Sequence, residues 1–120
     1  MHETSLIQFT LDAVERRAKE LGICHVSDIR LVIGELRGAV PEQMEIAFHL
    51  LTSADQARGL FSGARLDIEY RPVLLRCRAC GHPFPSTLEA YAKAVCPRCE
   101  SASHEILSGD ELLIDSFCGE

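Results

Sequence analysis

The sequence predicts an α+β fold in which two helices pack on a small mixed sheet, with a zinc-ribbon-like module of four cysteines inserted between strands. Three observations lead to this fold class. Apolar residues recur at helical spacing in segments 2–21 and 41–57, and short segments that alternate apolar and polar residues follow each of them. Two Cys-x-x-Cys pairs interrupt the strand-forming sequence between residues 77 and 99. Helices and strands in this order favour two helices on one face of a sheet.

The first helix is expected to begin at His2 or Thr4 and to end at Leu21. Its apolar stripe consists of residues three or four positions apart: Ile7, Leu11, Val14, Ala18 and Leu21. Gly22 follows directly, and glycine readily takes the left-handed conformation that often ends a helix. The pattern therefore predicts the start, the buried face and the end of this helix.

A strand is expected from Val26 to Leu36, because apolar residues alternate with polar ones in its first half. Pro41 suits the first turn of a second helix, where a backbone amide would have no intrahelical partner. The apolar stripe of this helix continues to about Ala57. His49 lies off the stripe, so we expect its side chain on the surface.

The next strand is expected to start near Ala64. Pro72 interrupts it, which indicates a sheet edge or a bend. Residues 73–75 are apolar and lead straight into the first cysteine pair. The cysteine pairs are therefore expected to extend from a strand.

Between the two cysteine pairs, residues 81–86 are expected to form a loop, and residues 88–95 a short helical turn or a strand. After the second pair, strand segments are expected at 105–107 and 111–117. The turn-forming residues 108–110 lie between these segments and predict a hairpin.

Composition and charge narrow the class of protein. A chain of 120 residues with 47% apolar residues is expected to form one domain that carries a small metal-bound part. Its apolar runs are too short to cross a bilayer, and its first residues do not resemble a signal peptide, so we expect a cytoplasmic protein. The net charge is −6, although segment 71–100 carries five basic and two acidic side chains. The acidic remainder disfavours nucleic acid as a partner.

The two cysteine pairs are the strongest motif, Cys77-Arg-Ala-Cys80 and Cys96-Pro-Arg-Cys99, separated by fifteen residues. This spacing indicates one tetrahedral ion held by four thiolates, with zinc favoured over iron. The alternative is two disulfides or four unrelated cysteines, which is less common in a chain without a secretory signal. Four protein ligands leave no open position, so the site is expected to hold the fold together.

Other reactive side chains have weaker patterns. Cys24 and Cys118 are expected to be buried or idle thiols. His82 and His104 flank the cysteine pairs, and we expect them to lie beside the metal ligands or to be exposed. The alternative is that one of them replaces a thiolate when the pH or a second metal changes. No segment carries a signature of nucleophilic or acid–base catalysis or a phosphate-binding loop, so we do not expect an enzyme.

The N-terminal residues Met1-His2-Glu3 place three nitrogen donors close together. These are the Met1 amine, the His2 amide nitrogen and the His2 imidazole, a set that suits square-planar Ni(II) or Cu(II). Glu3 can add a carboxylate oxygen or a further amide nitrogen. The alternative is an ordinary frayed terminus that binds no metal.

Several segments together resemble the HypA/HybF family of hydrogenase-maturation nickel chaperones. The matching residues are Met1-His2-Glu3-Thr4-Ser5-Leu6, Ile33-Gly34-Glu35-Leu36-Arg37-Gly38, Pro41-Glu42 and the two Cys-x-x-Cys pairs. The resemblance implies that His2 is the essential nickel ligand, together with backbone nitrogens that include the Met1 amine. It implies that Glu3 supports or joins this site. It also implies that Cys77, Cys80, Cys96 and Cys99 hold structural zinc.

The resemblance also implies an organisation and a role. The expected parts are a nickel-binding α/β domain at residues 1–75 plus 104–120 and a zinc-binding module at residues 76–103. The expected function is a nickel metallochaperone that delivers Ni(II) for maturation of a [NiFe] hydrogenase. The implied partners are a nickel-handling GTPase of the same pathway and the hydrogenase large subunit, and a homodimer is compatible with them.

Two other functions fit parts of the sequence. A zinc-ribbon nucleic-acid-binding module would use the basic segment, in which Arg76, Arg78 and Arg98 lie close to the cysteines. A rubredoxin-like electron carrier would use the same four thiolates to hold iron. A salt-dependent gel shift would favour the first alternative, and a red protein with a one-electron couple would favour the second.

Overall fold

The computed structural model describes residues 2–53 and 59–120. Its elements follow one another in this order: α1 (Glu3–Glu20), β1 (Val26–Gly34), the 3₁₀ helix η1 (Glu35–Arg37), α2 (Pro41–Ser53), β2 (Arg65–Arg71), β3 (Val73–Cys77), β4 (Pro83–Ser86), the 3₁₀ helix η2 (Tyr91–Lys93), β5 (His104–Ser108) and β6 (Leu112–Gly119). The strands form two three-stranded sheets, ordered β2-β1-β6 and β4-β3-β5. This arrangement confirms the predicted α+β class.

The chain divides into two compact units, which we describe separately. The helical unit comprises Met1–Leu31, Ala39–Glu69 and Leu113–Glu120. The cysteine unit comprises Val32–Gly38 and Tyr70–Leu112. The metal module was expected at residues 76–103, and this range lies inside the cysteine unit. The limits 76 and 103 themselves remain a prediction.

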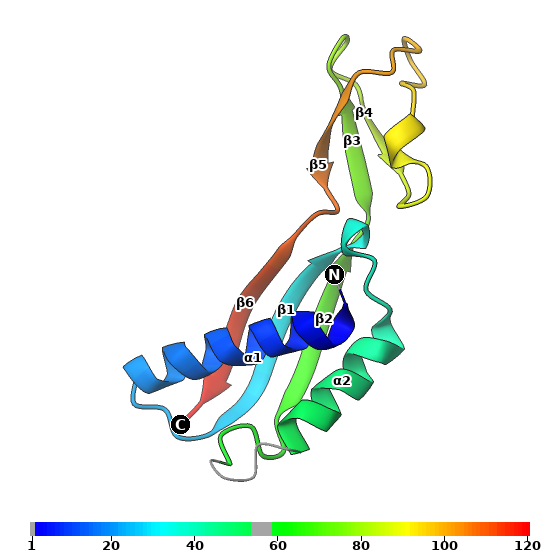
Figure 1. Ribbon diagram of the computed structural model, residues 1–120. Helices are drawn as coiled ribbons and strands as arrows, with labels where there is room; N and C mark the ends of the chain where they lie inside the picture. Colours follow the sequence, from blue (N-terminus) through cyan, green and yellow to red (C-terminus); the bar gives the residue numbers. More distant parts are fainter. Residues whose placement is uncertain (1, 54–58) are drawn as a thin grey trace. The chain divides into compact units, whose positions relative to one another are not determined.

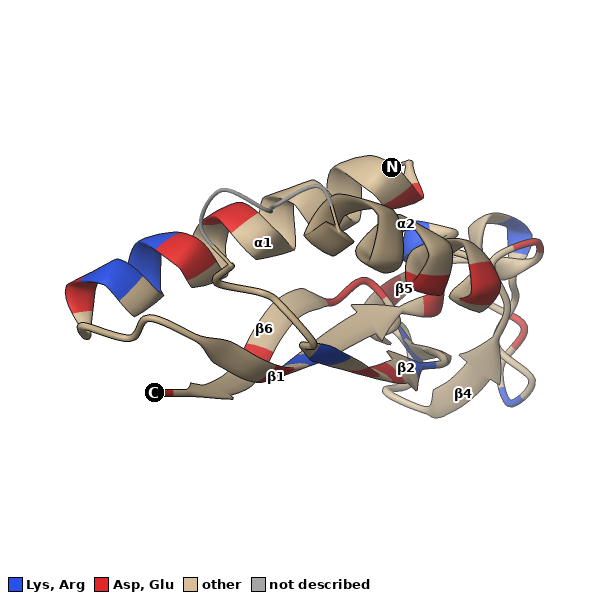
Figure 2. Cartoon of the chain, turned by 90° about the horizontal axis from the view of Figure 1, so that it is seen from below, with Lys and Arg blue, Asp and Glu red and all other residues tan. Residues whose placement is uncertain are grey.

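In the helical unit, α1 and α2 cover the same face of the sheet (Figures 1 and 2). β2 runs parallel to β1, as a crossover through α2 requires, and β6 runs in the opposite direction (Figure 1). His25 and Glu120 exchange backbone hydrogen bonds of 2.9 Å, which is an antiparallel pairing next to the ends of β1 and β6. The buried side chains of the unit come from both helices, from β1 and from the residues before β2: Leu6, Ile7, Thr10, Leu11, Val14, Ala18, Val26, Ile29, Leu31, Met44, Ala47, Phe48, Leu60 and Phe61.

The first helix agrees closely with the sequence prediction. It extends over Glu3–Glu20, with His2 as its N-cap and Leu21 as its C-cap. Gly22 has a φ of 71°, and the Ile23 amide donates to the Ala18 carbonyl at 2.9 Å, which is the six-to-one bond of a Schellman motif. Leu21 is half exposed, because it caps the helix instead of extending its buried stripe. The predicted continuation of α2 over residues 54–57 lies outside the described residues.

The predicted strand 26–36 is too long at its C-terminal end. β1 stops at Gly34, and the next three residues form η1. The Leu36 amide donates to the Gly109 carbonyl at 2.7 Å, and Arg37 Nε donates to the Asp110 carbonyl at 3.0 Å. These bonds within the cysteine unit turn the backbone out of the strand.

In the cysteine unit, β3 is the central strand and pairs antiparallel with both β4 and β5. Residues 81–86 were expected as a loop, and this prediction is wrong for Pro83–Ser86, which form β4. Phe84 pairs with Leu75 in the register, and its side chain is buried. Prolines are tolerated in β4 because it is an edge strand. Of the segment 88–95, Tyr91–Lys93 form the 3₁₀ helix η2.

The predicted hairpin through residues 108–110 is also wrong. Both flanking strands exist, but β5 pairs with β3 and β6 belongs to the other sheet. Gly109, with a φ of 112°, lies against the backbone of Val73, so the turn leads from one sheet to the other. Residues 108–110 therefore form a turn, as their composition indicated, but the strands on either side of it do not pair with each other.

Candidate metal centre

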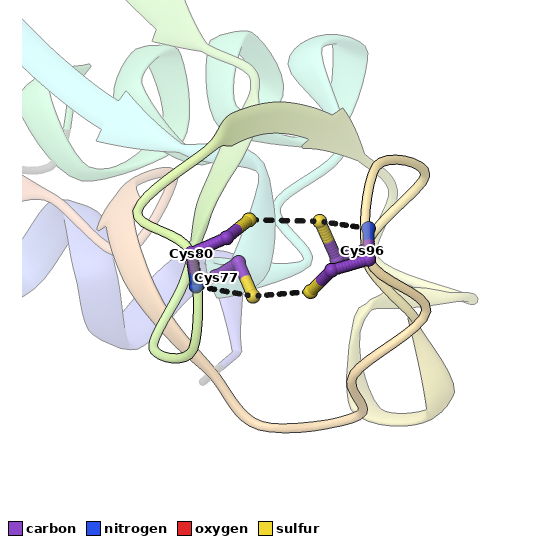
Figure 3. A group of neighbouring side chains, drawn as sticks. Cys77, Cys80 and Cys96 are labelled. Carbon is purple, nitrogen blue, oxygen red and sulfur yellow. Dashed lines mark hydrogen bonds between the residues drawn. The ribbon is translucent and has the colours of Figure 1, made fainter.

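Two loops of similar conformation present the four cysteines. In the first loop, the amides of Ala79 and Cys80 donate to Cys77 Sγ at 3.3 and 3.4 Å. In the second loop, the amides two and three residues after Cys96 donate to Cys96 Sγ at the same distances, 3.3 and 3.4 Å. Figure 3 shows the Cys80 thiol directed toward that of Cys96 on the facing loop, and the Cys77 thiol faces the second cysteine of that loop, Cys99. The first cysteine of each pair is therefore surrounded by backbone donors that stabilise a thiolate.

Each loop is closed by one further hydrogen bond at equivalent positions. The Gly81 amide donates to the Cys77 carbonyl at 2.9 Å, and the Glu100 amide donates to the Cys96 carbonyl at 2.8 Å. Both donors have left-handed backbones, with φ of 78° at Gly81 and 65° at Glu100. The two Cys-x-x-Cys loops, which we call knuckles, therefore share one backbone conformation. Only the first knuckle has glycine at the left-handed position.

The sulfur atoms lie close enough together to share one ion. The four Sγ atoms of Cys77, Cys80, Cys96 and Cys99 are all within 4.8 Å of one another. Cys77 and Cys99 are 3.4 Å apart, and Cys80 and Cys96 are 3.6 Å apart. Sulfurs at tetrahedral positions around zinc would be separated by about 3.8 Å, so the donor set and its spacing fit a tetrahedral thiolate site.

The surroundings of the thiols shift their pKa values in different directions, down at Cys77 and Cys96 and up at Cys99. The hydrogen bond from the Cys80 amide is the main cause that lowers the pKa of Cys77 to about 6. Burial opposes the change at Cys96, but the amides of Cys99 and Arg98 lower the pKa of that thiol. At Cys99 the Ser101 amide lowers the pKa, but the hydrogen bond to Cys77 and burial outweigh it and raise the pKa of that thiol to about 12. The cluster thus stabilises thiolate at Cys77 before any metal binds.

The two flanking histidines have different positions. His104 on β5 lies opposite Cys77 in the strand register. Among the described residues, its Nδ1 is a buried atom without a hydrogen-bond partner. His82 contributes its carbonyl, which accepts from the Cys77 amide at 3.0 Å. The exchange of either histidine for a thiolate therefore remains a prediction.

The predicted nickel residues lie in the helical unit, at the start of α1. His2 is exposed, and its Nδ1 accepts a hydrogen bond from the Thr4 amide at 3.3 Å. Glu3 Oε2 accepts from the Val40 amide at 3.0 Å, and this bond is the main cause that lowers the pKa of Glu3. Met1 lies outside the described residues.

Sequence reasoning missed the partners of these two side chains. Neither Thr4 nor Val40 carried a sequence signal for these contacts, and Val40 was notable only for preceding Pro41. Cys24 and Cys118, which were expected to be buried or idle, are exposed free thiols. None of the described helices is long and apolar enough to cross a membrane.

The fold and the cysteine cluster together define an α+β protein with four cysteines placed so that they could hold one metal ion. Residues 1–118 match the family model of HypA, described as hydrogenase/urease nickel incorporation, metallochaperone. The chain belongs to the HypA family, which confirms the resemblance seen in the sequence.

Known relatives and solved structures agree with this membership. The hydrogenase maturation factor HypA of Moorella thermoacetica is 36% identical over 126 residues, which cover 100% of both chains. That of Pelodictyon phaeoclathratiforme is 38% identical over 117 residues, covering 98% of this chain and 94% of the relative. The solution structure of the Ni metallochaperone HypA from Helicobacter pylori has a TM-score of 0.66 and 26% identity, covering 99% of this chain and 97% of that chain.

Proposed function

We propose that this protein binds one Ni(II) ion at its N-terminus and delivers it, as cargo, for maturation of a [NiFe] hydrogenase. Membership of a family described by nickel incorporation supports this role. The observation that carries the proposal is the position of His2 and Glu3, which are adjacent residues at the start of α1 and carry nitrogen and oxygen donors. With the Met1 amine, they supply donors of the kind that Ni(II) prefers.

The cysteine centre has a different proposed role. We infer that Cys77, Cys80, Cys96 and Cys99 hold Zn(II), because four thiolates in a closed tetrahedral arrangement are typical of structural zinc. Zinc at this position would join the two knuckles, so its binding free energy would contribute to folding. A closed cage retains its ion, whereas an exposed terminal site can both capture and release one.

The proposed partners follow from the proposed cargo. They are a nickel-handling GTPase of the hydrogenase maturation pathway and the large subunit of a [NiFe] hydrogenase, and the protein would act in the cytoplasm as a carrier without catalysis. A homodimer is compatible with this role. In this proposal the nickel-binding domain comprises residues 1–75 plus 104–120, and the zinc-binding module comprises residues 76–103.

Nickel titration tests the proposed cargo site. The comparison uses untagged protein, His2→Ala and a variant with one residue added before Met1. We expect both variants to bind nickel differently from the parent and to keep their zinc and fold. His2→Ala removes the imidazole, and the added residue turns the Met1 amine into an amide and moves the free amine one residue away from His2. A variant that binds nickel as the parent does would contradict the site. Cys77→Ala should have the opposite effect, with loss of zinc and stability.

The nucleic-acid alternative depends on the basic side chains near the cysteines. In the structure, Arg76 is 4.0 Å from Glu105, and Arg78 Nε donates to the His104 carbonyl at 3.0 Å. The Glu105 carboxylate offsets part of the charge of Arg76, and the bond to His104 engages one of the Arg78 donors. A gel shift at low salt tests this alternative, and no binding would exclude it. Colour and metal content test the rubredoxin-like alternative, since iron would give a red protein and zinc a colourless one.

A further inference from the structure

The His2 ring has a structural role that does not involve metal. Its Nδ1 accepts the Thr4 amide at 3.3 Å, which makes His2 the N-cap of α1. The first amides of a helix have no intrahelical acceptor, so a side-chain acceptor at this position stabilises the helix. The backbone carbonyl of His2 also accepts the Leu6 amide at 3.0 Å, which is the first intrahelical bond. The side chain and backbone of His2 thus begin the helix together.

The proposed nickel site needs the same ring nitrogen. A metal bound to the amide nitrogen of His2 closes a six-membered ring with Nδ1 of the same residue, whereas Nε2 points away from the backbone. A neutral imidazole has one acceptor nitrogen, with one lone pair in the ring plane. Nδ1 can therefore accept the Thr4 amide or bind the metal, but it cannot do both.

Glu3 differs from His2 in this respect. A carboxylate has two oxygens that can accept hydrogen bonds or bind a cation. Oε2 accepts the Val40 amide, which precedes α2, at 3.0 Å. Glu3 can therefore keep its bond to Val40 with one oxygen while the other faces a metal.

We propose that the Thr4 amide competes with Ni(II) for His2 Nδ1, so that nickel uptake removes the cap of α1 and nickel release restores it. This inference depends on the proposed function, in which His2 is a nickel ligand. The cap lowers nickel affinity by a factor equal to its own contribution to helix stability, about fivefold for a typical N-cap. When the metal leaves, His2 Nδ1 accepts the Thr4 amide again. This exchange of partners suits a carrier that must release its cargo.

The first test removes the competing donor and leaves His2 intact. Thr4→Pro removes the amide that His2 accepts, and proline is tolerated in the first turn of a helix. Ser5→Pro is the matched control, because it places the same ring one residue later and keeps the Thr4 amide. We expect Thr4→Pro to bind nickel about two- to tenfold more tightly than Ser5→Pro in a titration with nickel alone. Equal or weaker binding by Thr4→Pro would overturn the competition.

The second test follows the Thr4 amide in the unaltered protein. Hydrogen exchange is started with and without saturating nickel and quenched in acid, which strips the metal, and the amides are then read by NMR. We expect faster exchange at Thr4 with nickel and unchanged exchange at Val40. Unchanged exchange at Thr4 in nickel-saturated protein would overturn the competition.

His2→Asn separates this inference from the proposed function. Asparagine is a good N-cap but has no imidazole, so the variant should keep the helix start, lose tight nickel binding and show no nickel effect at Thr4. If His2→Asn binds nickel as tightly as the parent, the nickel site itself is wrong. If it loses nickel while the parent shows no change at Thr4, only the competition is wrong.

Discussion

Glu100 has a left-handed backbone, with a φ of 65°, at the position where the first knuckle has Gly81 with a φ of 78°. A side chain in this conformation crowds its own backbone, at a cost of about 1–2 kcal/mol. The bond from the Glu100 amide to the Cys96 carbonyl closes the second knuckle and requires this backbone. The second knuckle therefore contains strain that the first avoids.

Replacing Glu100 by glycine is expected to stabilise the zinc-loaded protein. The free energy of unfolding should rise by about 0.5–1 kcal/mol, because glycine adopts the left-handed conformation without a steric cost. Thermal or urea unfolding at a fixed zinc concentration measures the change. The reciprocal variant, Gly81→Ala, should lower stability by about 1 kcal/mol. A loss of stability in Glu100→Gly would show that the glutamate side chain contributes more than its strain costs.

At the scale of elements, Gly34–Arg37 join the end of β1 to the rest of the cysteine unit. Glu35 Oε2 accepts the Leu88 amide at 2.7 Å, and Leu36 packs against the buried cluster that includes Val73 and Cys77. Gly34 lies against the Gly109 backbone so closely that a Cβ would overlap the Gly109 carbonyl. This segment of the family resemblance is therefore explained by packing within the cysteine unit.

Gly34→Ala is expected to destabilise the protein by about 3 kcal/mol, because the added methyl group meets backbone atoms that cannot rotate away. Its φ of −81° suits alanine, so the cost is steric. Gly22→Ala is the control, since Gly22 has a φ of 71° and open space around it, and should lose only about 1 kcal/mol. Comparable losses in the two variants, measured by urea unfolding, would contradict the close contact at Gly34.

For the whole molecule, metal binding, protonation and folding are linked through the cysteine centre. Cys77, with a pKa of about 6, is a thiolate at neutral pH before zinc binds, whereas Cys99, with a pKa of about 12, must still release its proton. Because the pKa of Cys77 is lowered in the folded state, its stabilising effect in metal-free protein is present above the unfolded value and is lost as the pH falls through about 6.

Zinc affinity is expected to fall more steeply with acidification below pH about 6 than above it. Below that pH, Cys77 must also release a proton when zinc binds, so up to one more proton is released for each zinc bound. The lowered pKa of Cys96 has an effect in the same direction. Competition against a chromophoric zinc chelator across this pH range measures the slope. The slope of the logarithm of zinc affinity against pH should be steeper below pH about 6 than above it. A constant slope would contradict the lowered pKa of Cys77.

Features determined by neighbouring residues could be predicted from the sequence by itself. The limits of α1 and the left-handed Gly22 that follows its C-cap depend on short-range spacing and on local backbone preference. Within each Cys-x-x-Cys loop, the surroundings of the first thiol also follow from the spacing, because the loop's own backbone amides donate to its sulfur. The four sulfurs come within 4.8 Å of one another as expected, but the meeting of the two loops depends on the tertiary structure.

Only the tertiary structure decided which strands pair and what the polar groups of the nickel residues contact. β4 forms because β3 offers it a partner, and β5 and β6 separate into two sheets although their turn resembled a hairpin. Glu3 meets Val40, which lies far along the chain, and no pattern in either segment indicates it. The physical reason is that strand pairing and long-range hydrogen bonds depend on which surfaces the whole chain buries together, whereas periodicity records only the preference of each segment.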